Sequence, residues 1–167
     1  RILIIDDNDR QARRIAMTLK QEHRPILWSE AEGKAGVDLV ILSLDAKAFD
    51  PLRLCAHFKS QAATRDLPIL IVADFEEEAK GMRALELGAG DIIMRPIDTE
   101  ELSARVRTQV RKKRSLDAMR RRLDESMELA ITDQLTGLFN RRHLVKQMQQ
   151  FLNRANSGGS PVSVFIA

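Results

Sequence analysis

Short apolar runs alternate with helical patterns through the first hundred residues, and this alternation limits the fold more than any other feature of the sequence. Residues 2–5 read Ile-Leu-Ile-Ile, an uninterrupted apolar run typical of a strand that is buried on both faces. Four more strands are predicted over residues 25–28, 37–42, 67–73 and 92–94, and helices over 54–60 and 76–87. Strands and helices in this order predict an α/β fold with a five-stranded parallel sheet.

The connection between the second and third predicted strands is short. Only eight residues, 29–36, separate them, whereas a crossover that contains a helix needs about ten to twelve or more. We therefore expect the second helix to be reduced to a turn, unless residues are missing between Trp28 and Val37. Five units of this size fit a flavodoxin-like, doubly wound sheet, in which chemistry takes place beyond the carboxyl ends of the strands.

Three motifs lie in these strands or directly after them. Asp6 and Asp7 follow the first strand, the run 38–42 forms the third, and Leu-Gly-Ala-Gly-Asp at 87–91 leads to Arg95-Pro96. In this order, over residues 1–113, they resemble the CheY-like receiver domain of response regulators. The resemblance implies an Asp that ends the third strand and accepts phosphate, and an acidic pair that helps to hold Mg²⁺. It also implies a Thr or Ser at the end of the fourth strand and a Lys before the Pro.

Three of those working positions carry other residues here, namely Ser43, Ala73 and Arg95. An acyl phosphate needs a carboxylate nucleophile, and the hydroxyl of Ser43 is a poor one, since no His stands nearby in sequence to act as a base. Asp6 and Asp7 alone should bind Mg²⁺ weakly, so we expect no metal or cofactor in this chain. The sequence predicts a receiver fold that is not phosphorylated. Asp45 or Asp50 as a replacement acceptor remains an alternative.

A long helical pattern follows from residue 98 to about residue 131, of which 114–131 form a predicted linker. Six of its nine heptad-like positions are apolar, an imperfect seam. The nine are Leu102, Val106, Gln109, Lys113, Leu116, Arg120, Leu123, Met127 and Ala130. We expect the first part to pack on the receiver and the later part on a partner helix or the next domain. A solvated linker helix is the alternative.

A second motif follows the long helix. Its residues are Asp133, Leu135, Thr136, Gly137, Leu138, Phe139, Asn140, Arg141 and Arg142. Locally it predicts a wide turn: Gly137 can adopt positive φ, Asn140 can cap a helix over 141–153, and Asp133 can pair with Arg141 or Arg142.

Leu135, Leu138 and Phe139 are expected to anchor this turn in a core. The inward face of the next helix would carry Leu144, Met148, Phe151 and Leu152. Residues 157–161 should break that helix, and 162–167 should begin a strand.

The second motif resembles the opening of the GGDEF domain of diguanylate cyclases, so residues 132–167 would be the truncated start of that α+β domain. The full order resembles PleD-type response regulators. The resemblance implies a parent that makes cyclic di-GMP from two GTP with Mg²⁺, as a homodimer, under the control of an upstream phosphorylatable receiver. This chain would be the adaptor and would hold no catalytic residue. Arg24 would contact cyclic di-GMP bound as an inhibitor, unless it is an ordinary surface arginine.

The charge distribution limits the classes of function that remain. Residues 105–122 hold nine Arg or Lys against one acid, a local charge of +8 within a net charge of +3. No aromatic residue interleaves this run, so we favour a solvated or partner-facing helix over a DNA contact. A DNA-binding response regulator, and a scaffold with a degenerate GGDEF domain, stay as alternatives.

The location of the protein is also constrained. Cys55 is the only cysteine, which favours neither a disulfide nor a zinc site and fits a reducing cytoplasm. No apolar run is long enough to span a membrane. The sequence begins at Arg1 with neither a Met nor a signal-peptide pattern, so we expect it to be part of a longer protein.

Overall fold

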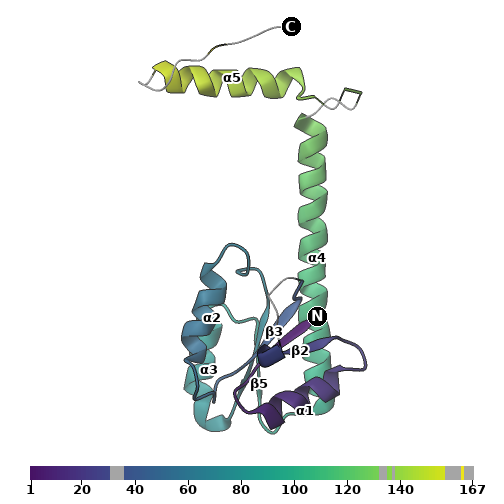
Figure 1. The fold of residues 1–167 in the computed structure, drawn as a ribbon, viewed down its shortest axis with the longest axis vertical. Helices are drawn as coiled ribbons and strands as arrows, with labels where there is room; N and C mark the ends of the chain where they lie inside the picture. The colour runs from purple at the N-terminus through teal and green to yellow at the C-terminus, as the bar shows by residue number, and fades with distance from the viewer. Residues whose placement is uncertain (31–35, 132–134, 137, 157–162, 164–167) are drawn as a thin grey trace. The chain divides into compact units, whose positions relative to one another are not determined.

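The computed structural model describes residues 1–30, 36–131, 135–136, 138–156 and 163. The chain divides into two compact units, Arg1–Leu116 and Asp117–Ala167. The first unit contains the sheet and the candidate site (Figure 1). Each unit is described by itself.

The first unit is built on a five-stranded parallel sheet in the order β2-β1-β3-β4-β5. The strands are β1 (Ile2–Ile5), β2 (Pro25–Leu27), β3 (Leu39–Ser43), β4 (Ile69–Ala73) and β5 (Asp91–Met94). This order confirms the predicted flavodoxin-like sheet. The third strand begins two residues later than predicted, because Asp38 lies outside the strand and its carboxylate accepts from the amino group of Arg1 at 2.6 Å.

In the described part of the chain, five α-helices and two short 3-10 turns connect or follow the strands. The helices are α1 (Asp9–Leu19), α2 (Pro51–Ser60), α3 (Glu78–Glu86), α4 (Thr99–Ile131) and α5 (Arg141–Asn156). The 3-10 turns are η1 (Trp28–Glu30) and η2 (Phe75–Glu77). Between β2 and β3 the described residues form η1. Residues 31–35 lie outside the described part, so the reduction of the second helix to a turn stays a prediction.

Side-chain caps explain where the helices begin. The Asn8 side chain accepts from the backbone of Gln11 at 3.3 Å, and Asp98 accepts from Glu100 and Glu101 at 2.9 and 2.8 Å. α2 begins three residues earlier than predicted, because the Asp50 carboxylate caps it and Pro51 occupies its first turn.

The end of α3 shows a different device. Gly88 follows the last turn of α3 with φ of +100°, a left-handed conformation that residues other than glycine rarely adopt. This glycine stops the helix as the sequence predicted. At the other end of α3, residues 75–77 form η2. The α-helix therefore begins at Glu78, two residues later than the predicted start at residue 76.

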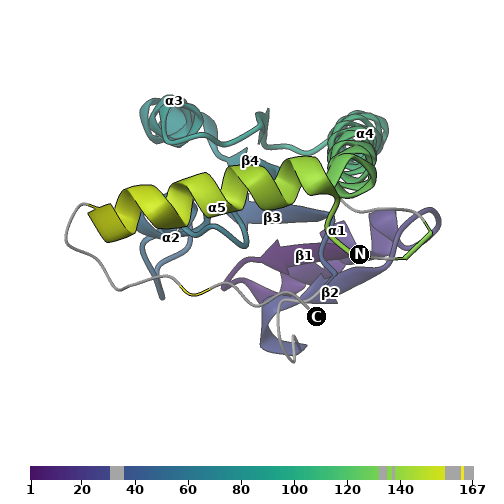
Figure 2. The same ribbon diagram turned by 90° about the horizontal axis from the view of Figure 1, so that it is seen from above.

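Helices cover both faces of the sheet, α1 and α4 on one side and α2 and α3 on the other (Figure 2). One core cluster joins alternate strand residues such as Ile41 and Val72 to Leu102 and Val106 of α4. The other joins the intervening strand residues to Cys55 and Phe58 of α2, among others. The central strands β3 and β4 are buried along their whole length, as required for a parallel sheet covered on both faces.

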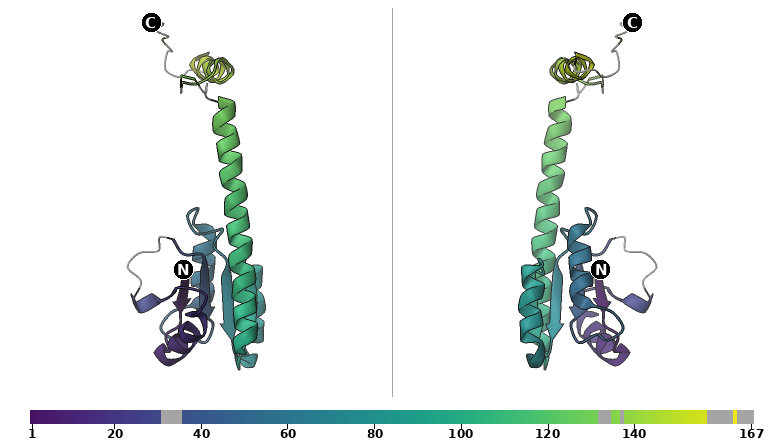
Figure 3. Two further views of the ribbon diagram at one scale, coloured as in Figure 1. Left: turned by 90° about the vertical axis from the view of Figure 1, so that its right-hand side faces the viewer. Right: turned by 90° about the vertical axis from the view of Figure 1, so that its left-hand side faces the viewer.

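α4 changes character along its 33 residues, which span about 50 Å at 1.5 Å per residue. Leu102, Val106 and Val110 are almost fully buried, and Figure 3 shows this part of the helix running beside the sheet. The expectation that the first part packs on the receiver is therefore confirmed. Further along, Leu116, Met119 and Leu123 are each more than half exposed. Their contact with a partner stays a prediction.

In the second unit the predicted cap is present, since the Asn140 carboxamide accepts from His143 at 2.9 Å at the start of α5. The helix continues to Asn156, three residues beyond the predicted end. Asp133, Gly137, the break at 157–161 and most of the strand predicted at 162–167 lie outside the described residues.

The core predicted around this turn is not formed. Six of the apolar residues assigned to it are 47–94% exposed: Leu135, Leu138, Phe139, Leu144, Phe151 and Leu152. The prediction was wrong for the described residues, because in this unit they form the end of α4, a turn and α5 but no sheet on which the apolar side chains could pack. Phe139 instead stacks on His143 with ring centroids 4.6 Å apart. No helix among the described residues is long and apolar enough to cross a membrane.

Shortening Ile41 at the centre of β3 to Ala should destabilise the first unit by about 2–5 kcal/mol, because the 1% exposed side chain leaves a cavity between sheet and helices. Urea unfolding followed by circular dichroism measures the loss. Met17→Ala, at a side chain that is 75% exposed, is the matched control and should change the unfolding free energy little. Equal losses in the two variants would contradict this account of the core.

Candidate functional site

The predicted pocket residues gather at the carboxyl edge of the sheet. Asp6 and Asp7 follow β1, Ser43 ends β3, Ala73 ends β4 and Arg95 follows β5. Because these are parallel strands, their carboxyl ends meet at one edge, and the connections that leave them surround a common pocket. The fold thus brings together residues that lie up to 89 positions apart in the chain.

Arg95 occupies the middle of this pocket. Its Nη1 lies 2.5 Å from Asp45 Oδ1 and 3.5 Å from Asp74 Oδ1. Its Nη2 donates to Ser43 Oγ at 2.9 Å and lies 3.4 Å from Asp6 Oδ2. The Arg95 side chain is only 15% exposed, so its charge is balanced by carboxylates at short range rather than by water.

Asp45 is the pocket residue that sequence reasoning undervalued. The sequence placed it in a loop beyond the strand end, as an alternative phosphate acceptor with Asp50. In the structure Asp45 lies in the pocket, where it accepts from Ser43 Oγ at 2.5 Å and from Arg95. The signal was its position three residues after a predicted strand end. Asp50 instead caps α2 and takes no part in these contacts.

Ser43 therefore does have a neighbouring carboxylate, although it has no His. Its hydroxyl donates to Asp45 and accepts from Arg95, so both of these hydrogen-bonding roles are in use. Burial of Asp45 raises its pKa, but the hydrogen bonds from Ser43 and Arg95 outweigh burial and hold the pKa of Asp45 below its usual range. A carboxylate of lowered pKa is a weak base for a hydroxyl.

The acidic pair after β1 is also engaged by the protein. Asp7 Oδ2 accepts from the backbone N–H groups of Lys47 and Ala48 at 2.5 and 2.9 Å, and these bonds lower the pKa of Asp7. Asp6 Oδ1 accepts from the backbone of Asn8 at 2.8 Å. The Asp6 side chain is 1% exposed, and its burial raises its pKa despite the nearby Arg95.

These contacts do not fit the Mg²⁺ that a receiver resemblance implies. A hard cation needs several free oxygen ligands, whereas Asp6 and Asp7 already accept hydrogen bonds and Ser43 replaces a carboxylate. The guanidinium of Arg95 adds a positive charge where the cation would be drawn. Among the described residues, no group of three or more His, Cys, Asp or Glu side chains is arranged to hold a metal ion.

Ala73 offers no side-chain hydrogen-bond donor, and its backbone carbonyl accepts from the Arg95 N–H at 2.9 Å. Arg24 is exposed and stands before β2 rather than at the pocket. It lines a separate hollow of about 470 Å³ together with Arg13 and Lys20.

The residues of the second motif belong to the second unit. Apart from the Asn140 cap, Thr136 Oγ1 accepts from Leu138 N at 3.4 Å. Arg141 begins α5, and the side chain of Arg142 lies outside the described part. These contacts give the turn and the helix start a local explanation and assign no chemistry to them.

Replacing Asp45 by Asn should flatten the acid dependence of stability. Because the folded-state pKa of Asp45 is lowered, its stabilising effect is present above the ordinary value of 3.8 and is lost as pH falls through the folded value. Asp45→Asn should cost about 2 kcal/mol at neutral pH and lose less on acidification than the parent chain.

Urea unfolding at neutral pH and below 3.8 measures this effect. Glu86→Gln, at an exposed position on α3, is the control and should keep the acid dependence of the parent chain. An unchanged slope in Asp45→Asn would contradict the ion pair with Arg95.

The first unit matches a known protein family. The response regulator receiver domain matches residues 2–107. Response regulator PleD of Caulobacter vibrioides is 50% identical over 171 residues, which cover 99% of this chain and 38% of the relative. Response regulator ArlR of Staphylococcus epidermidis is 32% identical over 126 residues, covering 71% of this chain and 56% of that relative.

A solved response regulator from Chloroflexus aurantiacus, described as putative, has the same fold, with a TM-score of 0.59 and 24% identity over 65% of this chain and 95% of that one. The present chain spans less than two thirds of the curated relatives named above. Sheet order, pocket position and the match over residues 2–107 agree, and the chain belongs to the response regulator receiver domain family.

Proposed function

We propose that this chain is the non-phosphorylated receiver of a PleD-type response regulator and acts as a dimerisation adaptor for a diguanylate cyclase. The observation that carries the proposal is the pocket in which Arg95 is held by Asp6 and Asp45, while Ser43 stands in place of an acceptor carboxylate. A phosphoryl group entering here would have to displace Arg95 from these carboxylates and would find no free nucleophile.

The cyclase part of the proposal rests on the likeness to PleD along 99% of this chain and on the motif at 133–142. The parent protein would convert two GTP to cyclic di-GMP with Mg²⁺. An upstream receiver of the same parent would accept the phosphate. This chain supplies no catalytic residue and joins the two parts.

The adaptor role is supported by the exposed apolar residues of α4. Leu116, Met119 and Leu123 lie more than half exposed on a helix whose residues 105–122 are strongly basic. Spacings of three, four and seven residues place them on one face, which suits pairing with a second α4. Since Lys113 and Arg120 share this stripe, the pairing would be weak in isolation.

Arg24 is proposed as a contact for cyclic di-GMP acting as an inhibitor. Its exposed side chain lies next to a hollow that Arg13 and Lys20 also line. Arg13 is paired with Asp9, so Arg24 and Lys20 would supply the cations for a ligand with two phosphates.

Beryllofluoride with Mg²⁺, a mimic of the phosphoryl group, should not bind this chain. Arg95 fills the pocket, Ser43 provides no carboxylate to accept the phosphoryl group, and Ala73 provides no side-chain hydrogen bond to it. Fluorine NMR measures the bound species. The triple variant Ser43→Asp, Ala73→Thr, Arg95→Lys restores the residue types that working receivers carry, and it should gain a bound signal.

Asp50→Asn is the matched control, because Asp50 lies outside the pocket and should leave the wild-type result unchanged. A bound signal in the wild-type chain that disappears in Asp45→Asn would overturn the proposal and identify Asp45 as an acceptor.

A Pro placed at Ala118 should uncouple the receiver from the cyclase without unfolding either. Ala118 is exposed and lies in the interior of α4, where Pro costs about 3 kcal/mol of helix stability. In the full-length protein we expect phosphorylation-dependent dimerisation to persist and most of the rise in cyclic di-GMP synthesis to be lost.

Sedimentation and a nucleotide assay measure the two effects, and Ala118→Ser is the control because it keeps the helix. Full activation in the Pro variant would show that α4 acts as a simple tether, which only raises the local concentration of the cyclase domains.

A further inference from the structure

An acidic projection with an exposed aromatic side chain follows β4. Phe75 begins η2 and is 70% exposed. The neighbouring Glu76 and Glu78 are exposed as well, and neither forms an ion pair with the described part of the chain. A Glu in the first turn of α3 is favoured by the helix dipole in any protein. The helix dipole does not explain the phenyl ring beside these acids, and aromatic side chains are enriched among the residues that anchor protein interfaces.

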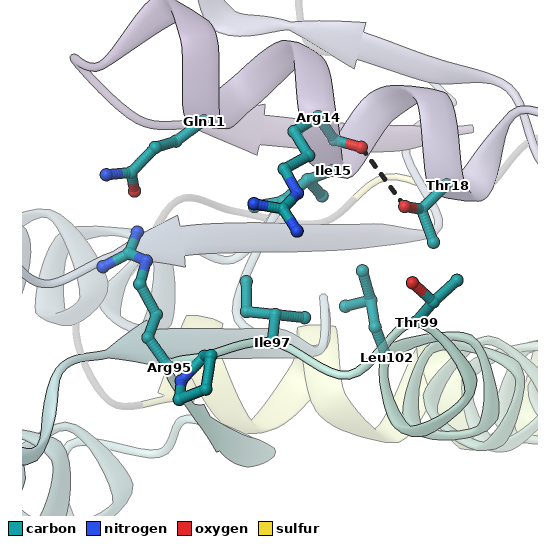
Figure 4. Close-up of a pocket in the computed structure, with 9 residues that line it drawn as sticks. Gln11, Arg14, Ile15, Thr18, Arg95, Ile97, Thr99 and Leu102 are labelled. Carbon is teal, nitrogen blue, oxygen red and sulfur yellow. Dashed lines mark hydrogen bonds between the residues drawn. The ribbon is translucent and has the colours of Figure 1, made fainter.

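A hollow of about 410 Å³ lies between α1 and the residues that join β5 to α4. Its apolar lining comes from Ile15, Pro96, Ile97 and Leu102. Figure 4 shows Arg14 extending from α1 toward this hollow, with Ile97 and Leu102 on the opposite side. Arg14 and Arg95 also line the hollow, and because Arg95 is already paired with Asp6 and Asp45, Arg14 is the cation open to a partner.

The cations beside the hollow are available for a partner. Arg14 is exposed, and so is Arg10 one turn earlier on α1. Within the described residues neither arginine forms an ion pair, whereas Arg13 on the same helix is bound to Asp9 at 3.0 Å. At the edge of the hollow, the Gln11 Oε1 atom is buried and accepts no hydrogen bond from the described residues. Charge and hydrogen-bonding capacity here suit an acidic projection.

The projection lies at the carboxyl edge of the sheet, and the hollow begins at that edge and extends along α1 and α4. η2 follows the carboxyl end of β4, and the hollow is lined by residues that follow β5 and β1. Two copies that face each other across a twofold axis at this edge would each offer a projection to the other copy's hollow. Such a contact is isologous, because the same two features meet twice with their roles exchanged.

We propose that the carboxyl edge of the receiver is a self-complementary docking surface for a second copy of this chain. Phe75 of one copy enters the hollow of the other, Glu78 pairs with Arg14, and Glu76 pairs with Arg10. The inference rests on the proposed dimerisation role and names a surface for it that is separate from the exposed stripe of α4. The phenyl ring carries most of the affinity, since exposed ion pairs contribute little and mainly fix the orientation.

Charge reversal tests the contact. Arg14→Glu alone sets Glu against Glu78, and Glu78→Arg alone sets Arg against Arg14, so each variant should associate at least about tenfold more weakly than the wild-type chain in sedimentation equilibrium. A mixture of the two variants restores opposite charges at both contacts and should recover dimers. Phe75→Ala should weaken association by about tenfold or more, with no recovery on mixing.

Controls of equal charge change lie elsewhere on the first unit. Arg53→Glu on α2 and Glu86→Arg at the end of α3 alter exposed residues outside the hollow and the projection. They should associate like the wild-type chain, alone and mixed. Circular dichroism of every variant checks that the fold is retained, and recovery on mixing can occur only if both variants fold.

The outcomes separate this surface from the proposed function. Wild-type association that persists unchanged in Arg14→Glu, Glu78→Arg and Phe75→Ala overturns the surface and leaves the adaptor role standing. A wild-type chain that stays monomeric at millimolar concentration overturns both. Weakened variants that do not recover on mixing also overturn the pairing of Arg14 with Glu78.

Discussion

Burial of a parallel sheet on both faces is the constraint on which this structure depends. Strands β3 and β4 expose almost no surface, so helices must cover each side, and every connection must begin at the carboxyl edge. That requirement places the ends of β1, β3 and β4 and the start of the β5–α4 connection around one pocket. The residues at this edge are therefore free to vary in chemistry while the sheet beneath them keeps the same packing.

Arg95 is an example of unusual chemistry at this edge. Its guanidinium reaches Asp6, Asp45 and Ser43 from the far strand, and its charge is balanced inside the protein. An internal cation of this kind ties three connections together. The same edge also carries the hollow beside Arg14 and the projection at Phe75, so the pocket and the proposed docking surface share their supporting strands.

The helix α4 links this edge to the rest of the chain. Leu102 and Val106 fix its first turns in the core, whereas Leu116 and Leu123 are exposed. A change in how two copies dock would act on the fixed part, and a continuous helix would carry the change along its length. Control in the proposed adaptor would then depend on differences in packing between states, since only differential interactions shift an equilibrium.

Apolar periodicity, glycine and capping residues in the sequence determined the five strands, most helix ends and the receiver fold, because these signals are local and the parallel sheet admits few alternatives. Tertiary structure decided which side chains meet. From the sequence, Asp45 was predicted to be a loop residue beyond the strand end. The fold places it beside Ser43 and beside Arg95, which is fifty positions away in the chain. The sequence also predicted buried positions for Leu135 and Phe139 that the structure leaves exposed, because an apolar pattern specifies a face and not the partner that covers it.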